Sequence, residues 1–268
     1  YTYLYPSDGR PDVYSDPAQA AEQAAFEVGR GFTAVKFDPA GPYTAFDGHQ
    51  PGLEDIDRSV AITGAIREAV GSRADLLFGT HGQFTAAGAI RLAQQLEPFD
   101  PLWFEEPTQP DQPEEMARVA RQTSIPVATG ERLTTISEFA ALARHQAAAI
   151  WQPNLGRCGG LLAGKKIAAI AEAAGCQIAP HLYSGPILGA ANIQLAATLP
   201  NLLIAEGIQD WTGFHADLLT RPIEWADGFV IPSREPGLGT ELDETVALAH
   251  PYPADGELHL SMVDVPVR

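Results

Sequence analysis

Residues 76–84 read LLFGTHGQF, an apolar run followed by small and polar residues. The apolar part, residues 76–78, is typical of a buried β-strand. Thr80 and His81 follow at the point where such a strand reaches its end, and Gly79 precedes them. The stretch therefore predicts a strand that delivers polar side chains to a site. It also raises the question of why the first position facing that site carries no side chain.

Similar short β-branched or aromatic runs recur along the chain, and amphipathic stretches separate them. Eight runs are found, at 2–5, 34–38, 76–81, 102–106, 127–131, 149–154, 177–183 and 202–208. Helical patterns lie between them, at 17–29, 56–70, 86–96, 113–121, 137–144 and 161–174. This alternation indicates βα units around a parallel sheet. Eight units predict an α/β fold, a (β/α)₈ TIM-like barrel over residues 1–222.

The alternation stops after the eighth run. Residues 223–268 carry Pro and Gly at short intervals, including the stretch EPGLGTEL at 235–242. We interpret this part as a C-terminal extension of the barrel. A chain of 268 residues is long enough for one large domain with a sizeable core.

The charge and composition limit the classes of partner. The formal net charge is −17, which argues against binding to nucleic acid or to an anionic membrane surface. We interpret the charge as a solubility feature, with salt adaptation as the alternative. No apolar run approaches the roughly 18 to 20 residues that a membrane helix requires. The two cysteines, Cys158 and Cys176, are too few for a disulfide framework and favour a cytoplasmic location.

Polar residues end seven successive predicted strands. In a barrel of this kind the active site lies at the carboxyl ends of the strands. One polar strand end would mean little, because a strand end is also where a chain meets water. Seven directed at one mouth indicate an active site, and the residues are Lys36, Asp38, His81, Glu105, Glu106, Glu131, Arg132, Gln152, Asn154, His181 and Glu206.

The residue types indicate the chemistry. Glu105 and Glu131 come from adjacent strands and offer hard oxygen ligands, which suit Mg²⁺ better than Zn²⁺. Lys36 and His181 belong to strands on opposite sides of the ring and are potential proton carriers. A metal flanked by two proton carriers favours abstraction of a proton next to a carboxylate, because the metal stabilises the enediolate.

Six motifs, in this order and spacing, resemble the barrel domain of the enolase superfamily, in its mandelate racemase and acid-sugar dehydratase branch. The motifs are GFTAVKFD (31–38), PLWFEEP (101–107), PVATGERL (126–133), WQPNLGRCGG (151–160), APHLYSG (179–185) and PGLGTEL (236–242). The resemblance spans nearly the whole chain. It implies an N-terminal capping domain, absent from this chain, against which residues 223–268 are expected to pack.

The resemblance also implies one Mg²⁺ held by carboxylates that end strands three, four and five. Glu105 and Glu131 match the second and third of these, and Gly79 stands where the first would be. Asp38 stands where the family often has a second lysine, and we expect it to replace the missing ligand. Loss of the metal altogether is the opposite interpretation. Asn154 stands where an Asp usually orients the histidine of strand seven.

The function implied is that of a Mg²⁺-dependent acid-sugar dehydratase acting on a small anionic sugar acid. His181 is expected to be the base, with Lys36 as the alternative, and His81 the acid. Asn154 would orient His181, and Glu206 completes the predicted catalytic set. A sugar-acid epimerase or racemase, a lactone cycloisomerase and a catalytically silent sugar-acid-binding relative are the alternatives. We also expect a homo-oligomer.

Overall fold

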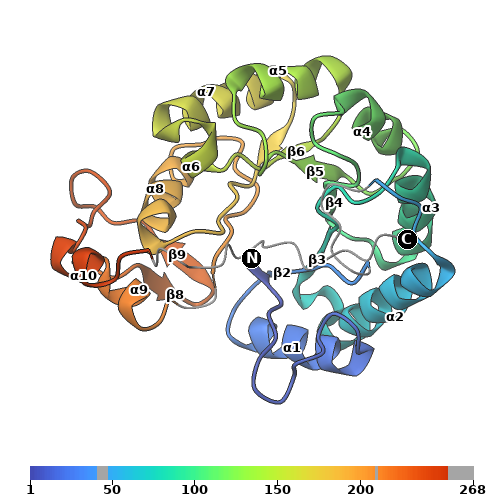
Figure 1. Ribbon diagram of the computed structural model, residues 1–268, viewed down its shortest axis with the longest axis horizontal. Helices are drawn as coiled ribbons and strands as arrows, with labels where there is room; N and C mark the ends of the chain where they lie inside the picture. Colours follow the sequence, from blue (N-terminus) through green and yellow to red (C-terminus); the bar gives the residue numbers. More distant parts are fainter. Residues whose placement is uncertain (41–47, 209–210, 253–268) are drawn as a thin grey trace.

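The computed structural model describes residues 1–40, 48–208 and 211–252. Within these ranges, seven parallel strands form one sheet in which neighbours in sequence are neighbours in space. The sheet curls around an interior (Figure 1). Its strands are β1 (Thr2–Tyr3), β2 (Ala34–Phe37), β3 (Asp75–Gly79), β4 (Trp103–Glu105), β5 (Val127–Thr129), β6 (Ile150–Trp151) and β7 (Gln177–Ile178). The predicted parallel α/β order is confirmed for these seven strands.

Helices connect the strands and cover the outer face of the curled sheet (Figure 1). They are α1 (Pro17–Gly29), α2 (Leu53–Val70), α3 (Ala86–Leu96), α4 (Pro113–Ala120), α5 (Ile136–His145), α6 (Leu155–Cys158), α7 (Gly160–Ala173) and α8 (Pro186–Ala196), with 3₁₀ turns at Gly71–Arg73 and Glu97–Phe99. The bounds of α1 and α3 coincide with the sequence prediction. In the described parts of the chain, no helix has the length and apolar character needed to cross a membrane.

Alternation of side chains divides the core into an outer and an inner layer. Leu76 and Phe78 of β3 belong to the large apolar cluster that includes residues of the helices. Leu77, between them, belongs to a small inner cluster that also contains Trp103 and Ile150. The interior of the curled sheet is therefore packed with side chains below the level at which the polar residues begin.

The predicted eighth strand, residues 202–208, is only partly formed. It makes isolated parallel bridges, from Leu202 to Ile178 on one side and from Gly207 to Thr2 on the other. The segment pairs with β7 at its start and with β1 at its end, so neither side builds a continuous ladder. It nevertheless lies beside both edges of the seven-stranded sheet.

The C-terminal extension forms a small separate sheet. It contains the antiparallel hairpin of β8 (Glu224–Ala226) and β9 (Phe229–Ile231), flanked by α9 (Phe214–Asp217) and α10 (Glu244–Ala249). The two residues of the hairpin turn, Asp227 and Gly228, both have positive φ, as a two-residue turn of the primed type requires. The last part of the predicted extension, residues 253–268, lies outside the described residues.

Candidate active site

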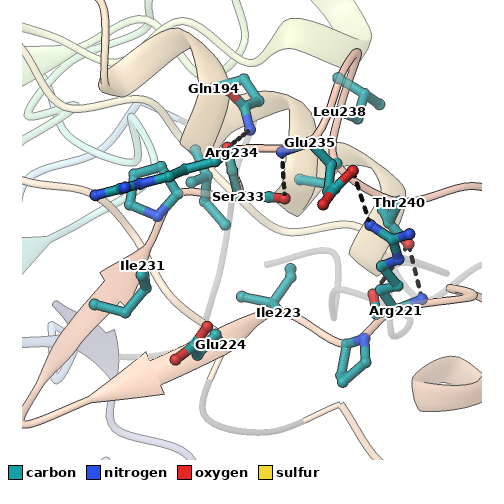
Figure 2. Close-up of a pocket in the computed structure, with 15 residues that line it drawn as sticks. Gln194, Arg221, Ile223, Glu224, Ile231, Ser233, Arg234, Glu235, Leu238 and Thr240 are labelled. Carbon is teal, nitrogen blue, oxygen red and sulfur yellow. Dashed lines mark hydrogen bonds and ion pairs between the residues drawn. The ribbon is translucent and has the colours of Figure 1, made fainter.

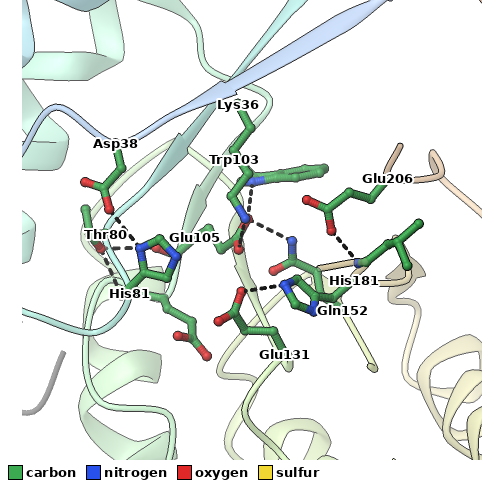
Figure 3. Close-up of polar contacts among 12 residues, drawn as sticks. Lys36, Asp38, Thr80, His81, Trp103, Glu105, Glu131, Gln152, His181 and Glu206 are labelled. Carbon is green, nitrogen blue, oxygen red and sulfur yellow. Dashed lines mark hydrogen bonds and ion pairs between the residues drawn. The ribbon is translucent and has the colours of Figure 1, made fainter. Parts of the chain in front are cut away.

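The predicted site residues lie on strands or just after them, on one side of the curled sheet's interior (Figure 3). Lys36 lies in β2, Asp38 and His81 follow β2 and β3, and Glu105 ends β4. Glu131 follows β5, Asn154 follows β6, and His181 follows β7. Glu206 lies in the segment that bridges β7 and β1. The parallel register explains this arrangement, because the carboxyl ends of all seven strands point the same way.

The centre of the site is a buried ion pair between Lys36 and Glu105. The Lys36 ammonium contacts Oε1 of Glu105, and each residue is 2% exposed. Oε2 of Glu105 accepts hydrogen bonds from Trp103 Nε1 at 3.0 Å and from Gln152 Nε2 at 2.8 Å. The ring of Tyr3 lies 5.7 Å from the ammonium nitrogen and adds a cation–π contact. Both oxygens of Glu105 are therefore bound by N–H donors of this chain.

Glu131 lies next to His181 on the other side of this pair. Its Oε2 is 3.2 Å from His181 Nε2, and both residues are buried. Nδ2 of Asn154 lies 2.8 Å from His181 Nδ1, which is the contact that an orienting residue would make. Burial would raise the pKa of Glu131, but His181, Lys36 and other nearby positive groups lower it to about 2. Glu131 is thus a carboxylate at neutral pH.

His81 is paired with Asp38. Its Nδ1 lies 2.8 Å from Asp38 Oδ2, and its side chain is 23% exposed. Burial alone would lower the pKa of His81, but the hydrogen bond and charge of Asp38 outweigh it and raise the pKa to about 8. Its backbone φ is 49°, in the left-handed region. The structure therefore brings Asp38 to His81, and not to Glu105 and Glu131 as the predicted metal ligand set requires.

A second contact joins the buried Glu106 to the partly buried Arg132. Arg132 Nε donates to Glu106 Oε2 at 2.8 Å, and its Nη2 donates to the backbone oxygen of His81, also at 2.8 Å. Burial and the neighbouring charge of Glu131 raise the pKa of Glu106 to about 8. Arg132 therefore ties the residue after β4 to the loop that carries His81.

Glu206 holds the backbone next to His181. Its Oε2 accepts a hydrogen bond of 2.6 Å from the N–H of Leu182. Burial and the charge of Glu206 together raise the pKa of the Tyr1 hydroxyl well above its usual range. Glu206 thus lies beside the segment that carries the predicted base, His181, and its observed hydrogen bond is to the backbone of that segment.

Three contributors to the site were not assigned a role from sequence. Trp103 stands two residues before Glu105 on the same face of β4, a period-2 signal that could have revealed it. Gln152 and Arg132 were recognised as polar strand ends, but their partners, Glu105 and Glu106, lie 47 and 26 residues away along the chain. Nothing in the sequence pattern specifies such pairings.

A separate groove of ≈ 420 Å³ lies between α8 and the C-terminal extension (Figure 2). Arg221 and Glu235 form an exposed ion pair at 3.5 Å along its wall, and Gln194 donates to the backbone oxygen of Ser233. The groove contains none of the residues predicted for catalysis. It is a feature of the extension and not of the candidate active site.

A curled seven-stranded parallel sheet with charged side chains at its strand ends defines an α/β domain. Residues 19–246 match the family described as Enolase C-terminal domain-like, and the chain belongs to this family. The solved mandelate racemase/muconate lactonizing enzyme from Sulfitobacter sp. is 56% identical, with a TM-score of 0.93; the match covers 99% of this chain and 67% of that chain. The predicted membership of the enolase superfamily is thereby confirmed.

Curated relatives are sugar-acid dehydratases. A D-gluconate dehydratase from Thermoproteus tenax is 34% identical over 86% of this chain, and a D-galactonate dehydratase from Variovorax paradoxus is 39% identical over 70%. The matches cover 46% and 51% of those proteins. The chain thus spans about half the length of these relatives.

Sites of the enolase superfamily use Mg²⁺ with a Lys or His base. The predicted site needs Glu105, Glu131 and Asp38 to direct oxygens at one point. Here Glu105 is bound by Lys36, and the other two carboxylates contact histidines. Among the described residues, no group of three or more His, Cys, Asp or Glu is placed to hold a metal ion. The donor set therefore does not fit the predicted Mg²⁺ site.

Proposed function

We propose that the full-length protein containing this chain is an acid-sugar dehydratase. It removes the proton α to the carboxylate of an aldonate and eliminates the β-hydroxyl to give a 2-keto-3-deoxy acid. One observation carries the proposal: two imidazoles, those of His81 and His181, follow strands of the same curled sheet and have chemically different partners, the carboxylate of Asp38 and the amide of Asn154. The names of the gluconate and galactonate dehydratases related to this chain support the same reaction class.

His181 is the base in this proposal. Elimination needs a neutral group to accept the α proton and a protonated group to assist the leaving hydroxyl. The amide of Asn154 holds the ring at Nδ1 without adding a charge, which leaves Nε2 as the edge that faces the site. Proton abstraction by Nε2 requires the tautomer that carries its proton on Nδ1, and the side-chain oxygen of Asn154 accepts that proton's hydrogen bond when the amide is turned over.

His81 is the acid. Asp38 keeps its pKa at about 8, so most of the population is protonated at neutral pH. A proton from His81 lets the β-hydroxyl leave as water, and the resulting enol tautomerises to the 2-keto acid. Asp38 is then a positioning residue for the acid.

Lys36 is less suited to the alternative role of base. Burial would lower its pKa, but Glu105, with Glu206 and Glu131, raises it above the ordinary lysine value. The ammonium therefore keeps its proton and supplies fixed positive charge near the place where the enediolate develops negative charge. Because the donor set does not fit Mg²⁺, the proposed steps assign no part to a metal.

The test separates the two proton transfers in the full-length protein. D-gluconate, D-galactonate and D-xylonate are screened for 2-keto acid formation, and exchange of the α proton is followed by NMR in deuterated water. We expect His181→Asn to lose both exchange and elimination. His81→Asn should keep exchange and lose elimination, each loss being about 10²-fold or more, as for removal of a general acid or base.

His145→Asn is the control, because His145 is partly exposed and pairs with Glu114 outside the site. Full dehydration by His81→Asn, or normal exchange by His181→Asn, would remove the corresponding role. Exchange with inversion and no elimination would identify an epimerase instead, and ring opening of a lactone would identify a cycloisomerase. Absence of exchange with every sugar acid would favour the silent binding protein.

We further infer four properties of the whole protein. The bridges of residues 202–207 to β7 and β1 support closure into a (β/α)₈ barrel. The groove beside the extension and the exposed side chains of Phe229 and Ile231 support packing of residues 223–268 against a capping domain. The thiols of Cys158 and Cys176 are free, which supports a cytoplasmic location. Homo-oligomer formation is proposed with them, and light scattering tests it.

A further inference from the structure

The space beside Gly79 contains a lysine side chain. Gly79 is the register partner of Glu105 in the adjacent strand β4. A Cβ atom built on Gly79 would lie 3.3 Å from Cε of Lys36 and 3.8 Å from the backbone oxygen of Phe37. A longer side chain at this position would therefore compete with Lys36 for the same space.

The Lys36 ammonium is held by buried partners. It contacts Oε1 of Glu105, faces the ring of Tyr3 and is 2% exposed. Glu131 and Glu206 also act on it electrostatically. Gly79 supplies no carboxylate at this position, and the side chain of Lys36 occupies the space beside it.

A divalent cation would meet two obstacles here. To reach Glu105 it must displace Lys36 from Oε1, while Trp103 and Gln152 already donate to Oε2. It would also lie close to the displaced ammonium in a buried pocket, where like charges repel strongly. The remaining carboxylates of the predicted set already contact His181 and His81.

We propose that the Lys36 ammonium replaces the divalent cation of this site, so that the protein binds no Mg²⁺ there. The inference concerns the cofactor of the proposed dehydratase. It rests on the proposed function only because that function identifies these residues as the active site. The absence of a side chain at Gly79 is then required, because it gives Lys36 access to Glu105.

The test measures metal binding directly, on the full-length protein after treatment with EDTA and dialysis. Mg²⁺ is titrated by calorimetry, and Mn²⁺ binding is followed by electron paramagnetic resonance. We expect no stoichiometric binding by the wild type. The double variant Gly79→Asp/Lys36→Met should bind one Mg²⁺ at least about tenfold more tightly than the wild type, because it restores three carboxylates and removes the competing charge.

Two further variants keep the result interpretable. Lys36→Arg retains a positive charge and should bind no metal, and circular dichroism shows whether each variant is folded. If the double variant does not fold, Lys36→Met alone replaces it, with tighter Mg²⁺ binding than the wild type expected again.

One Mg²⁺ bound to the wild type and lost in Glu105→Gln overturns the proposal. A folded Gly79→Asp/Lys36→Met variant, or the Lys36→Met variant used in its place, that binds Mg²⁺ no better than the wild type also overturns it. These readouts do not depend on turnover. Failure to form a 2-keto acid would therefore contradict the proposed function and leave the metal result intact.

Discussion

At the scale of the residue, the chemistry of His81 depends on one neighbour. Asp38 lies 2.8 Å from its Nδ1 and raises the pKa of the imidazole to about 8. Because this value exceeds the ordinary one of 6.5, the ion pair stabilises the fold fully below about pH 6.5. The contribution is lost as the pH rises through about 8.

We predict that Asp38→Asn lowers the pKa of His81 from about 8 toward 6.5 or below, because burial then acts without an opposing charge. The basic limb of the pH–rate profile for hydroxyl elimination should move down by the same amount. Histidine titration by NMR measures the pKa, and Asp38→Glu, which keeps a carboxylate, is the control. An unchanged pKa in Asp38→Asn would show that Asp38 does not control His81.

At the scale of the element, a glycine lets β5 deliver Glu131. Gly130 has φ +135° and follows β5 directly. A Cβ at this position would lie 2.8 Å from Cε1 of Phe139 in α5 and 2.9 Å from the backbone nitrogen of Gln152. The strand, the helix and the next strand end therefore approach one another too closely for any side chain.

Gly130→Ala should lower the free energy of unfolding by about 3 kcal/mol, because it combines a strained φ with overlap against backbone atoms. Gly175→Ala is the matched control. Gly175 also has positive φ, at +74°, but a Cβ there meets no atom within 4 Å, so only the backbone cost of about 1 kcal/mol applies. Urea denaturation measures both values, and equal losses would refute the close approach at Gly130.

At the scale of the whole molecule, the C-terminal hairpin docks on the edge of the curled sheet through Trp225. Its ring packs against Phe32, with centroids 5.8 Å apart. Its Cη2 atom would lie 2.5 Å from a Cβ on Gly207, so this glycine leaves the space that the indole fills. The hairpin thus contacts both the start of β2 and the segment that bridges β7 and β1.

Trp225→Ala should lower the free energy of unfolding by about 2 kcal/mol and increase hydrogen exchange in β8 and β9, because it leaves a cavity beside Gly207. Leu162→Ala is the control: this side chain of α7 is 71% exposed and lies outside the extension, and a change below about 0.5 kcal/mol is expected. Mass spectrometry after exchange in deuterated water localises the effect. Equal protection in both variants would mean that Trp225 does not anchor the hairpin.

Local pattern was sufficient to predict the order of the elements and the convergence of the polar strand ends. The periodicity of α1 and α3 depends on residues within one helix, and the predicted bounds coincide with the observed ones. The polar strand ends converge because parallel strands share one direction, and the order β1 to β7 is the predicted one. The sequence also showed that Gly79 stands where the resemblance places the first metal-binding carboxylate.

Only the tertiary structure decided which charged groups become partners. Asp38 was predicted to bind a metal together with Glu105 and Glu131, but its carboxylate pairs with His81 instead. Glu105 pairs with Lys36. The eighth run was predicted to be a full strand and forms isolated bridges. These outcomes depend on how tightly the sheet curls and on how buried charges compensate one another across strands far apart in sequence. No local pattern of residues contains that information.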